Sequence, residues 1–415
     1  MRLDLSSQIT LERVPKKYYK PDNDFEEYNL ARYEKLPVAI FEESNRAAKK
    51  IARDIVKELQ KNEKSGKPFV LGISGGASPV PVYEELVRMH KEDGVSFKNL
   101  TVFNTYEFYP CLEFSYFNLK MLKDIFLDKI DIDPDNIFSP DATVEKDLIS
   151  EICEEYEKNL KDKGGMDYLL LGLGSKGNIG FNMPGSSLHS QTRLVMLDGD
   201  SRVDIVRNFE SLDKVPVSAI TMGLYDLMEA KKITLLAWGE QKADSIKDIV
   251  EGTVTDLVPG SVLQTHPETT VYVDLAAASE LTRLSRPWLV TNCEWDSKLI
   301  RRAIVWLCGV VNKPILKLTN EDYNKNPDYY NELSAVKNDK VYGQLPYVSY
   351  YNNIETAMAD IYFLGKTLYP NEFKDIDVIE KADEIYTFML GKPLYNIMAE
   401  KYGGYIKINL KYKLD

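Results

Sequence analysis

The sequence has few of the residues that build metal sites and redox centres. Its 415 residues include only 3 histidines and 4 cysteines. The cysteines (Cys111, Cys153, Cys293 and Cys308) are far apart and never form the C-x-x-C spacing of a metal or redox site, so we expect reduced thiols. No His, Asp and Glu residues have the spacing of a metal-binding motif either. We therefore expect neither a metal nor a cofactor.

Positive charge and long apolar runs are also scarce. The net charge is −12, which argues against a general nucleic-acid binder because phosphate contacts need a basic surface. No run of about 18 apolar residues occurs, so no membrane-spanning helix is predicted. Residues 1–28 are polar and lack the apolar core of a secretory signal, which favours a cytoplasmic location. An anionic ligand would need a local cationic pocket.

Short apolar stretches alternate with amphipathic ones along most of the chain. Residues 39–62 have helical spacing, 67–74 form an apolar run typical of a strand, and 79–93 return to helical spacing. Further strands are predicted at 99–108, 166–174 and 232–239, and further helices at 116–130, 218–230 and 240–252. Buried strands that alternate with amphipathic helices predict an α/β fold, with a doubly wound, mainly parallel sheet and helices on both faces.

The chain is longer than one hydrophobic core usually fills, so more than one domain is expected. The apolar pattern and the composition change after residue 285. A further strand and helix are predicted there, followed by a polar connector rich in Asn and Tyr. A small C-terminal helical appendage comes next, with helices predicted at 352–369, 378–391 and 393–404. We predict an N-terminal extension at 1–34, an α/β domain at 35–285, a strand-helix extension of that domain at 286–325, a linker at 326–346 and a helical segment at 347–415.

Three loops follow predicted strands and should meet at one edge of the sheet. They are Ser74–Ser78, Asn104–Glu107 and Gly172–Ser187. In open α/β sheets, the ligand crevice lies beyond the carboxyl ends of the strands. We therefore expect the ligand-binding residues in these loops.

The stretch LGISGGASP, residues 71–79, places small residues where a strand turns into a helix. Glycine lets the backbone approach a ligand closely, and amide groups at a helix N-terminus attract phosphate or carboxylate. A tight turn also needs glycine, so this motif alone leaves both interpretations open. Arg207 and Lys242 are candidate cations for an anion, although the pattern around each, taken singly, favours a solvated surface residue.

Several stretches in the same order resemble one family. They are LGISGGASP, VRMHKEDGVSFKNLTVFN, GLGSKGNIGFNMPGSS, SQTRLVML, AWGEQKA, VEGTVTD and LQTHP. Together they resemble the glucosamine-6-phosphate deaminases, which are related to the 6-phosphogluconolactonases; both are doubly wound α/β proteins. The resemblance runs from about residue 35 to residue 285. Two stretches outside these limits, LSSQITLERV and RPWLVTNCEWDSKLIRRAIVWLCGVVNKPILKLTNEDY, resemble a longer variant of the family with extra sequence after the deaminase domain.

The resemblance implies a sugar-phosphate site. Its phosphate-binding positions correspond to Ser78 and its loop neighbours Gly75, Gly76 and Ala77, and to Arg207 and Lys242, although Ala77 replaces a glycine. Gly174 and Gly177 of the loop GLGSKGNIGFNMPGSS are expected to lie along the substrate. The implied partner is a small sugar phosphate, and a homo-oligomer is possible by analogy with related enzymes.

The acid–base groups implied by the resemblance are largely replaced. Short-chain members have aspartates at Tyr106 and Lys176, a histidine at Asn178 and a glutamate at Met183. The longer variant also has Tyr and Asn at the first and third of these positions but keeps the glutamate. We expect Glu107 to shuttle the proton, with Tyr106 and Asn178 as polar supports; a helix-capping carboxylate is the alternative for Glu107.

Three functions are compatible with this pattern. The first is an enzyme that isomerises and deaminates a phosphorylated amino sugar to a ketose phosphate and ammonia. The second is a non-catalytic sugar-phosphate binder with a regulatory role. The third, a 6-phosphogluconolactonase, is disfavoured because VRMHKEDGVSFKNLTVFN is closer to the deaminases.

Residues 347–404 show a separate resemblance, to the C-terminal helices of iron- or cobalamin-type periplasmic solute-binding proteins. Only a fragment of such a protein is covered, and the lobes that would enclose a ligand are missing. We expect this segment to be a helical cap or an interaction surface.

Overall fold

The chain divides into two compact units, residues 1–291 and 292–415. The computed structural model describes residues 14–110, 118–206, 209, 211–312, 342–345, 348–349 and 351–407. The division between residues 291 and 292 falls inside the segment 286–325, and the strand expected there does not occur in its described part, 286–312.

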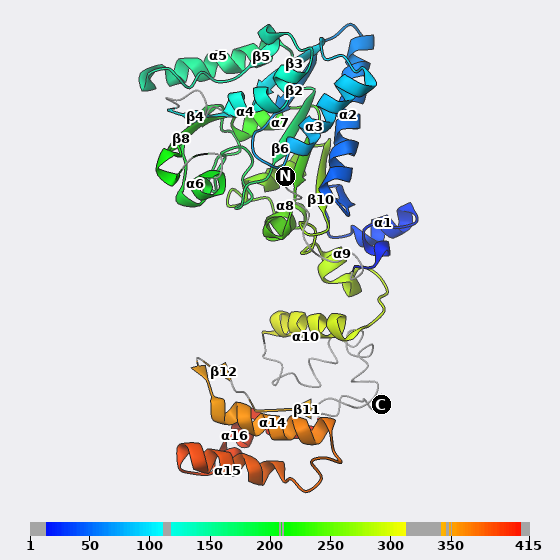
Figure 1. Cartoon of the computed structure of the whole chain (residues 1–415), viewed down its shortest axis with the longest axis vertical. Coiled ribbons are helices and arrows are strands. Elements are labelled where there is room, and N and C mark those ends of the chain that lie inside the picture. The colour runs from blue at the N-terminus through cyan, green and yellow to red at the C-terminus, as the bar shows by residue number, and fades with distance from the viewer. Residues whose placement is uncertain are drawn as a thin grey trace. The chain divides into compact units, whose positions relative to one another are not determined.

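A seven-stranded sheet forms the centre of the first unit (Figure 1). Every neighbouring pair of strands in it is parallel. This confirms the predicted doubly wound α/β class. In order across the sheet, the strands are β1 (Val38–Phe41), β10 (Thr269–Asp274), β9 (Ile233–Ala237), β6 (Tyr168–Gly172), β2 (Phe69–Ile73), β3 (Leu100–Asn104) and β5 (Ile137–Phe138).

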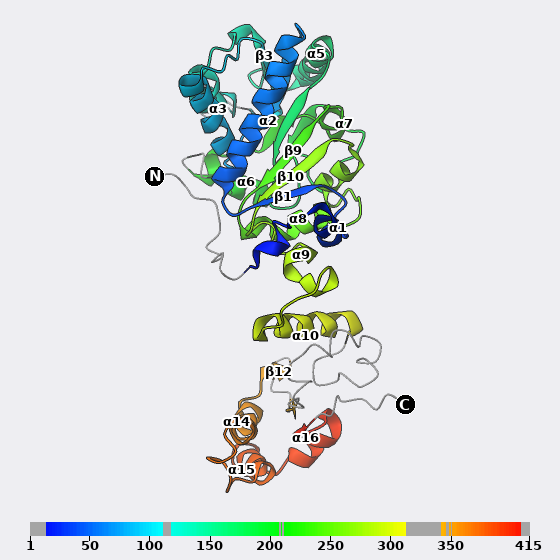
Figure 2. The ribbon, with the colours of Figure 1, turned by 90° about the vertical axis from the view of Figure 1, so that its right-hand side faces the viewer.

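Both faces of this sheet are covered, which explains why its strands are mostly apolar. Phe69, Leu71 and Ile73 of β2 belong to one buried core cluster together with residues of α2 (Ser44–Lys64) and α3 (Val80–Asp93). Figure 2 shows α2 lying along this face of the sheet. On the other face, the Phe103 ring of β3 lies 5.6 Å from the Tyr156 ring of α5 (Ile149–Asp162).

A second sheet of three antiparallel strands has the order β4 (Tyr106–Tyr109), β8 (Ser218–Thr221), β7 (Arg193–Met196). The prediction of one strand over 99–108 is therefore wrong. The chain leaves the main sheet at Thr105, whose N–H still donates to the Ile73 carbonyl, and Tyr106 then pairs with Thr221 of β8.

Two helix predictions also need correction. Residues 218–230 begin with the fully buried strand β8 and form a helix only at α7 (Leu224–Met228). Gly223 separates the two, and a Cβ there would lie 1.9 Å from the Ser190 carbonyl oxygen. Residues 39–62 likewise begin as strand β1, and the helix starts at Ser44. Short strands of four residues give too little sequence for their period to show.

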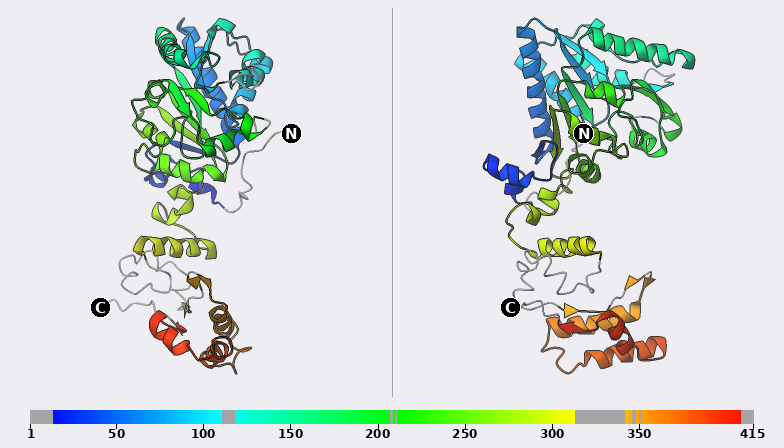
Figure 3. Two further views of the ribbon diagram at one scale, coloured as in Figure 1. Left: turned by 90° about the vertical axis from the view of Figure 1, so that its left-hand side faces the viewer. Right: turned by 180° about the vertical axis from the view of Figure 1, so that it is seen from behind.

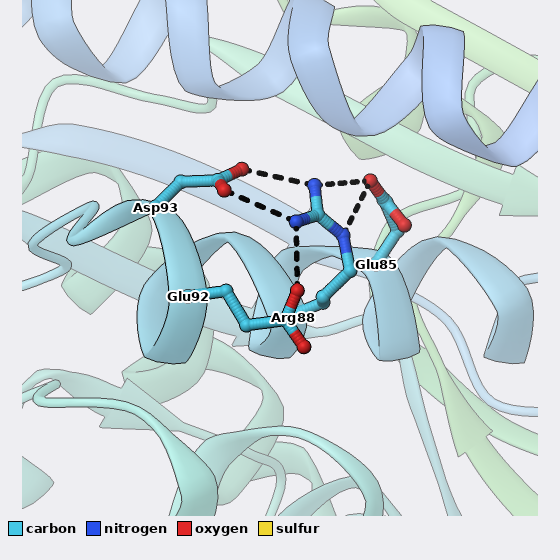
Figure 4. Close-up of polar contacts among 4 residues, drawn as sticks. All are labelled: Glu85, Arg88, Glu92 and Asp93. Atoms are coloured by element: carbon cyan, nitrogen blue, oxygen red, sulfur yellow. Dashed lines mark hydrogen bonds and ion pairs between the residues drawn. The ribbon is translucent and has the colours of Figure 1, made fainter.

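Helix α3 ends in a network of ion pairs (Figure 4). The Arg88 guanidinium contacts the carboxylates of Glu85 at 2.8 Å, Glu92 at 3.2 Å and Asp93 at 2.9 Å. These three carboxylates raise the pKa of Arg88 above its usual range. Exposed pairs of this kind contribute little individually, but several around one arginine hold the last turn of the helix. Further helices of the unit are α4 (Asn118–Ile125), α6 (Gly199–Ile205) and α8 (Ala243–Val250).

A buried arginine connects the N-terminal region to the rest of the first unit. Arg283 of α9 (Thr282–Ser285) is 1% exposed and donates from Nε to Glu34 at 2.6 Å and from Nη2 to Glu27 of α1 (Asp24–Leu30) at 2.8 Å. Burial raises the pKa of Glu34 to about 7, and the nearby Arg283 opposes that rise. Removing one member would leave a buried charge unpaired.

The second unit is mainly helical. Helices α14 (Ile354–Leu368), α15 (Val378–Leu390) and α16 (Tyr395–Tyr402) share a small core that includes Ala359, Tyr386 and Tyr395 (Figure 3). They fall where helices were predicted. The unit also has α10 (Ser297–Val311) and two two-stranded ladders, β11 (Tyr342–Gly343) with β14 (Ile406–Lys407) and β12 (Val348–Ser349) with β13 (Tyr351–Asn352). Among the described helices of both units, none is long and apolar enough to cross a membrane.

Candidate active site

The order of the strands locates the site. From β2 the chain passes to β3 on one side, while β6 later pairs with the opposite side of β2. The loops that leave β2 and β6 therefore diverge, and in doubly wound sheets such a switch point is where ligands bind. These are the loops that contain LGISGGASP and GLGSKGNIGFNMPGSS.

A cavity of about 240 Å³ opens at this switch point. Its walls come from the loops after β2, β6 and β9, from the first residue of β4 and from one side of α6. The lining residues are Ser74–Pro79, Tyr106, Gly172–Gly174, Asn178, Gly180, Phe181, Ser201, Asp204, Ile205, Trp238, Gln241 and Lys242.

The loop after β2 lines this cavity and contains backbone amides without a protein acceptor among the described residues. Within the described part of the chain, the N–H groups of Gly76, Ala77 and Ser78 donate to no protein acceptor, and helix α3 begins two residues later. Free amides at the start of a helix of this length attract an anion, because the helix dipole adds to their partial charges. The arrangement can hold a phosphate.

Neighbouring elements fix the two ends of this loop. The Ser74 hydroxyl donates to the Leu170 carbonyl of β6 at 3.1 Å, and the Tyr83 hydroxyl of α3 donates to the Ser74 carbonyl at 2.7 Å. At the other end, the Trp238 indole N–H donates to the Ser78 carbonyl at 2.9 Å. The loop is therefore held from β6, from α3 and from the end of β9, which keeps its amides in place before a ligand arrives.

Lys242 supplies positive charge to the same cavity. It lies just before α8, after a turn at Gly239 with φ of +88° that a side chain would strain. The Gly239 N–H donates to the buried carboxylate of Asp274 at the end of β10. Among the described residues of the lining, Lys242 is the only cation. Arg207, the other predicted cation, lies outside the described residues.

Tyr106 and Gly75 are packed against each other. A Cβ on Gly75 would lie 2.5 Å from the Tyr106 hydroxyl oxygen and 1.8 Å from Oδ1 of Asn118, so only glycine fits. The Tyr106 ring packs edge-on against Phe181, with centroids 4.6 Å apart. Burial raises the pKa of Tyr106 well above its usual range, with a smaller contribution from Glu107. Its phenol therefore stays protonated and can donate a hydrogen bond.

Glu107 lies behind the cavity and does not line it. Its carboxylate is 2% exposed and accepts hydrogen bonds from three backbone N–H groups, those of Phe108 at 2.9 Å, Asn118 at 2.6 Å and Leu119 at 2.9 Å. Burial raises its pKa to about 7, against the opposing effect of these hydrogen bonds. This is the geometry of a carboxylate that caps the N-terminus of α4.

Asn178 and Gly174 lie together in the loop after β6, and both line the cavity. The Asn178 amide donates to the Gly180 carbonyl at 3.2 Å, and its side chain occupies the space that a Cβ on Gly174 would need, with Oδ1 only 2.1 Å from that position. Gly177 has φ of +73° and accepts the Gly260 N–H at 2.8 Å. It forms the turn of this loop and does not line the cavity.

The two other substituted positions connect this loop to α6. The Lys176 ammonium pairs with Asp198 at 2.9 Å and Asp200 at 2.7 Å, at the start of that helix. The Ser201 hydroxyl lies 3.5 Å from the Met183 sulfur. Neither Lys176 nor Met183 lines the cavity. Their side chains hold α6 beside the loop, where the resemblance implies acid–base residues.

Asp204 also lines the cavity, although it was not among the residues predicted from the sequence. It lies in the same stretch as Arg207, three residues earlier, and that proximity to a proposed phosphate ligand was the one available signal. Groups of three or more His, Cys, Asp or Glu placed to hold a metal do not occur among the described residues.

Fold and cavity together define a doubly wound α/β protein with a cavity at the switch point of its sheet. Residues 42–272, more than half of the chain, match the family model of the glucosamine-6-phosphate isomerases/6-phosphogluconolactonase. The chain therefore belongs to this family.

Individual relatives agree with this assignment. A Bacteroides thetaiotaomicron protein described as glucosamine-6-phosphate deaminase-like is 51% identical over 327 residues, which are 79% of this chain and 49% of that relative, so this chain spans about half of its length. A glucosamine-6-phosphate deaminase of an Arthrobacter species is 40% identical over 56% of this chain and 87% of its own. The solved structure of a monomeric glucosamine-6-phosphate deaminase matches with a TM-score of 0.57 and 31% identity, over 59% of this chain and all of that one.

Proposed function

We propose that the chain binds a phosphorylated amino sugar and converts it to a ketose phosphate and ammonia. The observation that carries the proposal is the row of free amides at Gly76, Ala77 and Ser78, facing the same cavity as Lys242. Amides hold phosphate oxygens directionally, and a lysine adds a mobile point charge. Relatives named as deaminases support the choice of substrate.

The sugar would extend from this phosphate anchor toward Tyr106 and Asn178, which line the cavity. The protonated phenol can donate to a sugar oxygen, and the amide can both donate and accept. These groups can orient the opened sugar chain without changing charge. Arg207 remains a predicted further phosphate ligand, and Gly75, Gly174 and Gly177 shape the loops around the ligand.

Glu107, the residue expected to shuttle the proton, is better placed to position the loop Ser74–Ser78 after β2, the proposed anion loop. Its carboxylate holds the N–H of Asn118 at 2.6 Å, and the Asn118 side chain lies against Gly75 and donates to the Tyr106 carbonyl at 3.2 Å. A change at Glu107 would therefore reach the anion loop through one intervening residue. Its enclosure supports this role over direct contact with a substrate.

A non-catalytic sugar-phosphate binder is the second candidate. One observation favours it: Lys176 and Met183 stand at positions that the family resemblance assigns to acid–base groups, and both face α6 instead of the cavity. The anchor would then serve binding alone.

Two measurements on the full chain test the proposal. Glucosamine 6-phosphate should raise the thermal midpoint because it binds the native state, whereas glucosamine without phosphate should not. Ammonia release from glucosamine 6-phosphate, followed by a coupled glutamate dehydrogenase assay, should be detectable. Binding without ammonia release would favour the second candidate, and equal stabilisation by both sugars would refute the phosphate anchor. Lys242→Ala should abolish most of the stabilisation, with the exposed Lys231→Ala as a matched control.

A further inference from the structure

We propose that Asp204 is the acid–base residue of this site, which carries the proton between the two sugar carbons. This inference rests on the proposed deaminase function. Asp204 is the only carboxylate among the described residues that line the cavity. Carboxylates positioned beside a reacting carbon are common general bases.

One face of α6 is turned toward the cavity. Ser201, Asp204 and Ile205 all line it, and they are spaced at i, i+3 and i+4 along the helix. That spacing places the three side chains on the same side. Val203, between them in sequence, is 56% exposed and does not line the cavity.

The acidic residues near the start of α6 are already engaged. Asp198 accepts the Ser201 N–H at 2.8 Å as the helix N-cap and pairs with Lys176, and Asp200 pairs with Lys176 as well. In the described part of the chain, the Asp204 carboxylate has no hydrogen bond and no ion pair. It is therefore available to a ligand, whereas Asp198 and Asp200 have structural roles.

The Glu107 carboxylate, unlike that of Asp204, is already engaged in hydrogen bonds. Its two oxygens are occupied by the backbone at the start of α4, and it does not line the cavity. A base must come within hydrogen-bond distance of the proton that it removes. Asp204 lines the cavity, so it can approach a ligand there without any rearrangement of α4.

The proton transfer from C2 to C1 and the release of ammonia need only water as a co-reactant. In the opened sugar, Asp204 takes the proton from C2, and the electron pair of that bond forms a C1–C2 double bond while the C1 oxygen gains a proton from solvent. The protonated Asp204 then gives its proton to C1, the amine loses one proton to solvent, and the nitrogen is left as a C2 imine. Water adds to C2, ammonia leaves, and the C2 ketone remains.

Hydrogen exchange at C2 in D₂O, followed by proton NMR with glucosamine 6-phosphate, reports this step directly. Asp204→Asn should slow the exchange by about 100-fold or more at saturating substrate while the affinity measured by calorimetry stays within about threefold. The matched control Asp200→Asn removes the same charge from the same helix outside the cavity, and it should leave exchange and affinity near those of the parent.

The possible results separate the two proposals. If the parent chain does not bind the sugar phosphate, the proposed function is refuted. If the parent binds the sugar phosphate but shows no exchange at C2, the acid–base role of Asp204 is refuted and the non-catalytic sugar-phosphate binder is favoured. Exchange in Asp204→Asn at the parent rate, or a loss of affinity with unchanged exchange at saturation, would also overturn the inference.

Discussion

Replacing Gly75 by alanine should damage both the fold and the anion loop. The new Cβ would lie 1.8 Å from Oδ1 of Asn118 and 2.5 Å from the Tyr106 hydroxyl, where ordinary contacts are more than 3 Å. The Asn118 side chain is held by hydrogen bonds to Oδ1 of Asn104 at 2.8 Å and to the Tyr106 carbonyl at 3.2 Å. It cannot move aside without breaking them.

The size of the effect follows from these contacts. Overpacking in a well-packed region costs about 1–3 kcal/mol, and each buried hydrogen bond lost adds about 1 kcal/mol. We expect the free energy of unfolding to fall by about 2–4 kcal/mol. The displaced loop should also lose its stabilisation by glucosamine 6-phosphate.

Gly76→Ala is the matched control for this prediction. A Cβ at Gly76 meets nothing within 4 Å, so only the backbone strain of its φ of +90° remains, about 1–2 kcal/mol. Urea denaturation of the parent and both variants measures the difference. A Gly75→Ala protein that is as stable as Gly76→Ala and still responds to the sugar phosphate would refute the close packing of Gly75 against Tyr106 and Asn118.

Three other substitutions have defined outcomes. Glu107→Gln should lower the free energy of unfolding at pH 8 by about 1–3 kcal/mol in urea denaturation, because an amide cannot accept all three backbone N–H groups; unchanged stability would count against the capping role. Burial is the main cause that raises the pKa of Asp226 to about 6, and repulsion from Glu157 adds to the rise. The folded state therefore keeps a proton on Asp226 that the unfolded state loses near pH 4. The stabilisation from this proton is lost as the pH rises from about 4 to 6. Asp226→Asn should therefore gain about 2 kcal/mol relative to the parent between pH 4 and pH 6, and a pH-independent difference would contradict this pKa. Lys242→Ala should weaken glucosamine 6-phosphate binding by about tenfold in calorimetry, with a smaller effect at high salt; an unchanged dissociation constant would exclude Lys242 from the anchor.

Much of the fold could be predicted because its central strands are buried on both faces. Runs such as residues 69–73 and 233–237 are mostly apolar and lie between helices of clear period, so strands and helices could be distinguished. The failures fall on short elements. Residues 38–41 form a strand because β10 pairs with them, and residues 218–221 form a strand because β4 and β7 pair with them. A four-residue stretch does not contain this information.

The candidate site was partly predictable for a similar reason. Gly75 and Ser78 lie at a strand-to-helix turn, a local feature that can be read from spacing, and both line the cavity. The environments of Glu107 and Asp204 are not local. Glu107 is enclosed because α4 begins against it, and Asp204 reaches the cavity because Lys176 holds the start of α6 beside the loop after β6. From the sequence, Glu107 was expected to be the base and Asp204 was missed, because residue type does not tell which carboxylate is enclosed and which lines the cavity.

The most direct test of the account is a crystal structure of the chain with glucosamine 6-phosphate. The phosphate oxygens should lie about 3 Å from the amide nitrogens of Gly76, Ala77 and Ser78, with the Lys242 ammonium in contact with the same group. A sugar phosphate bound elsewhere, or bound in this cavity with its phosphate away from those amides, would contradict the central claim.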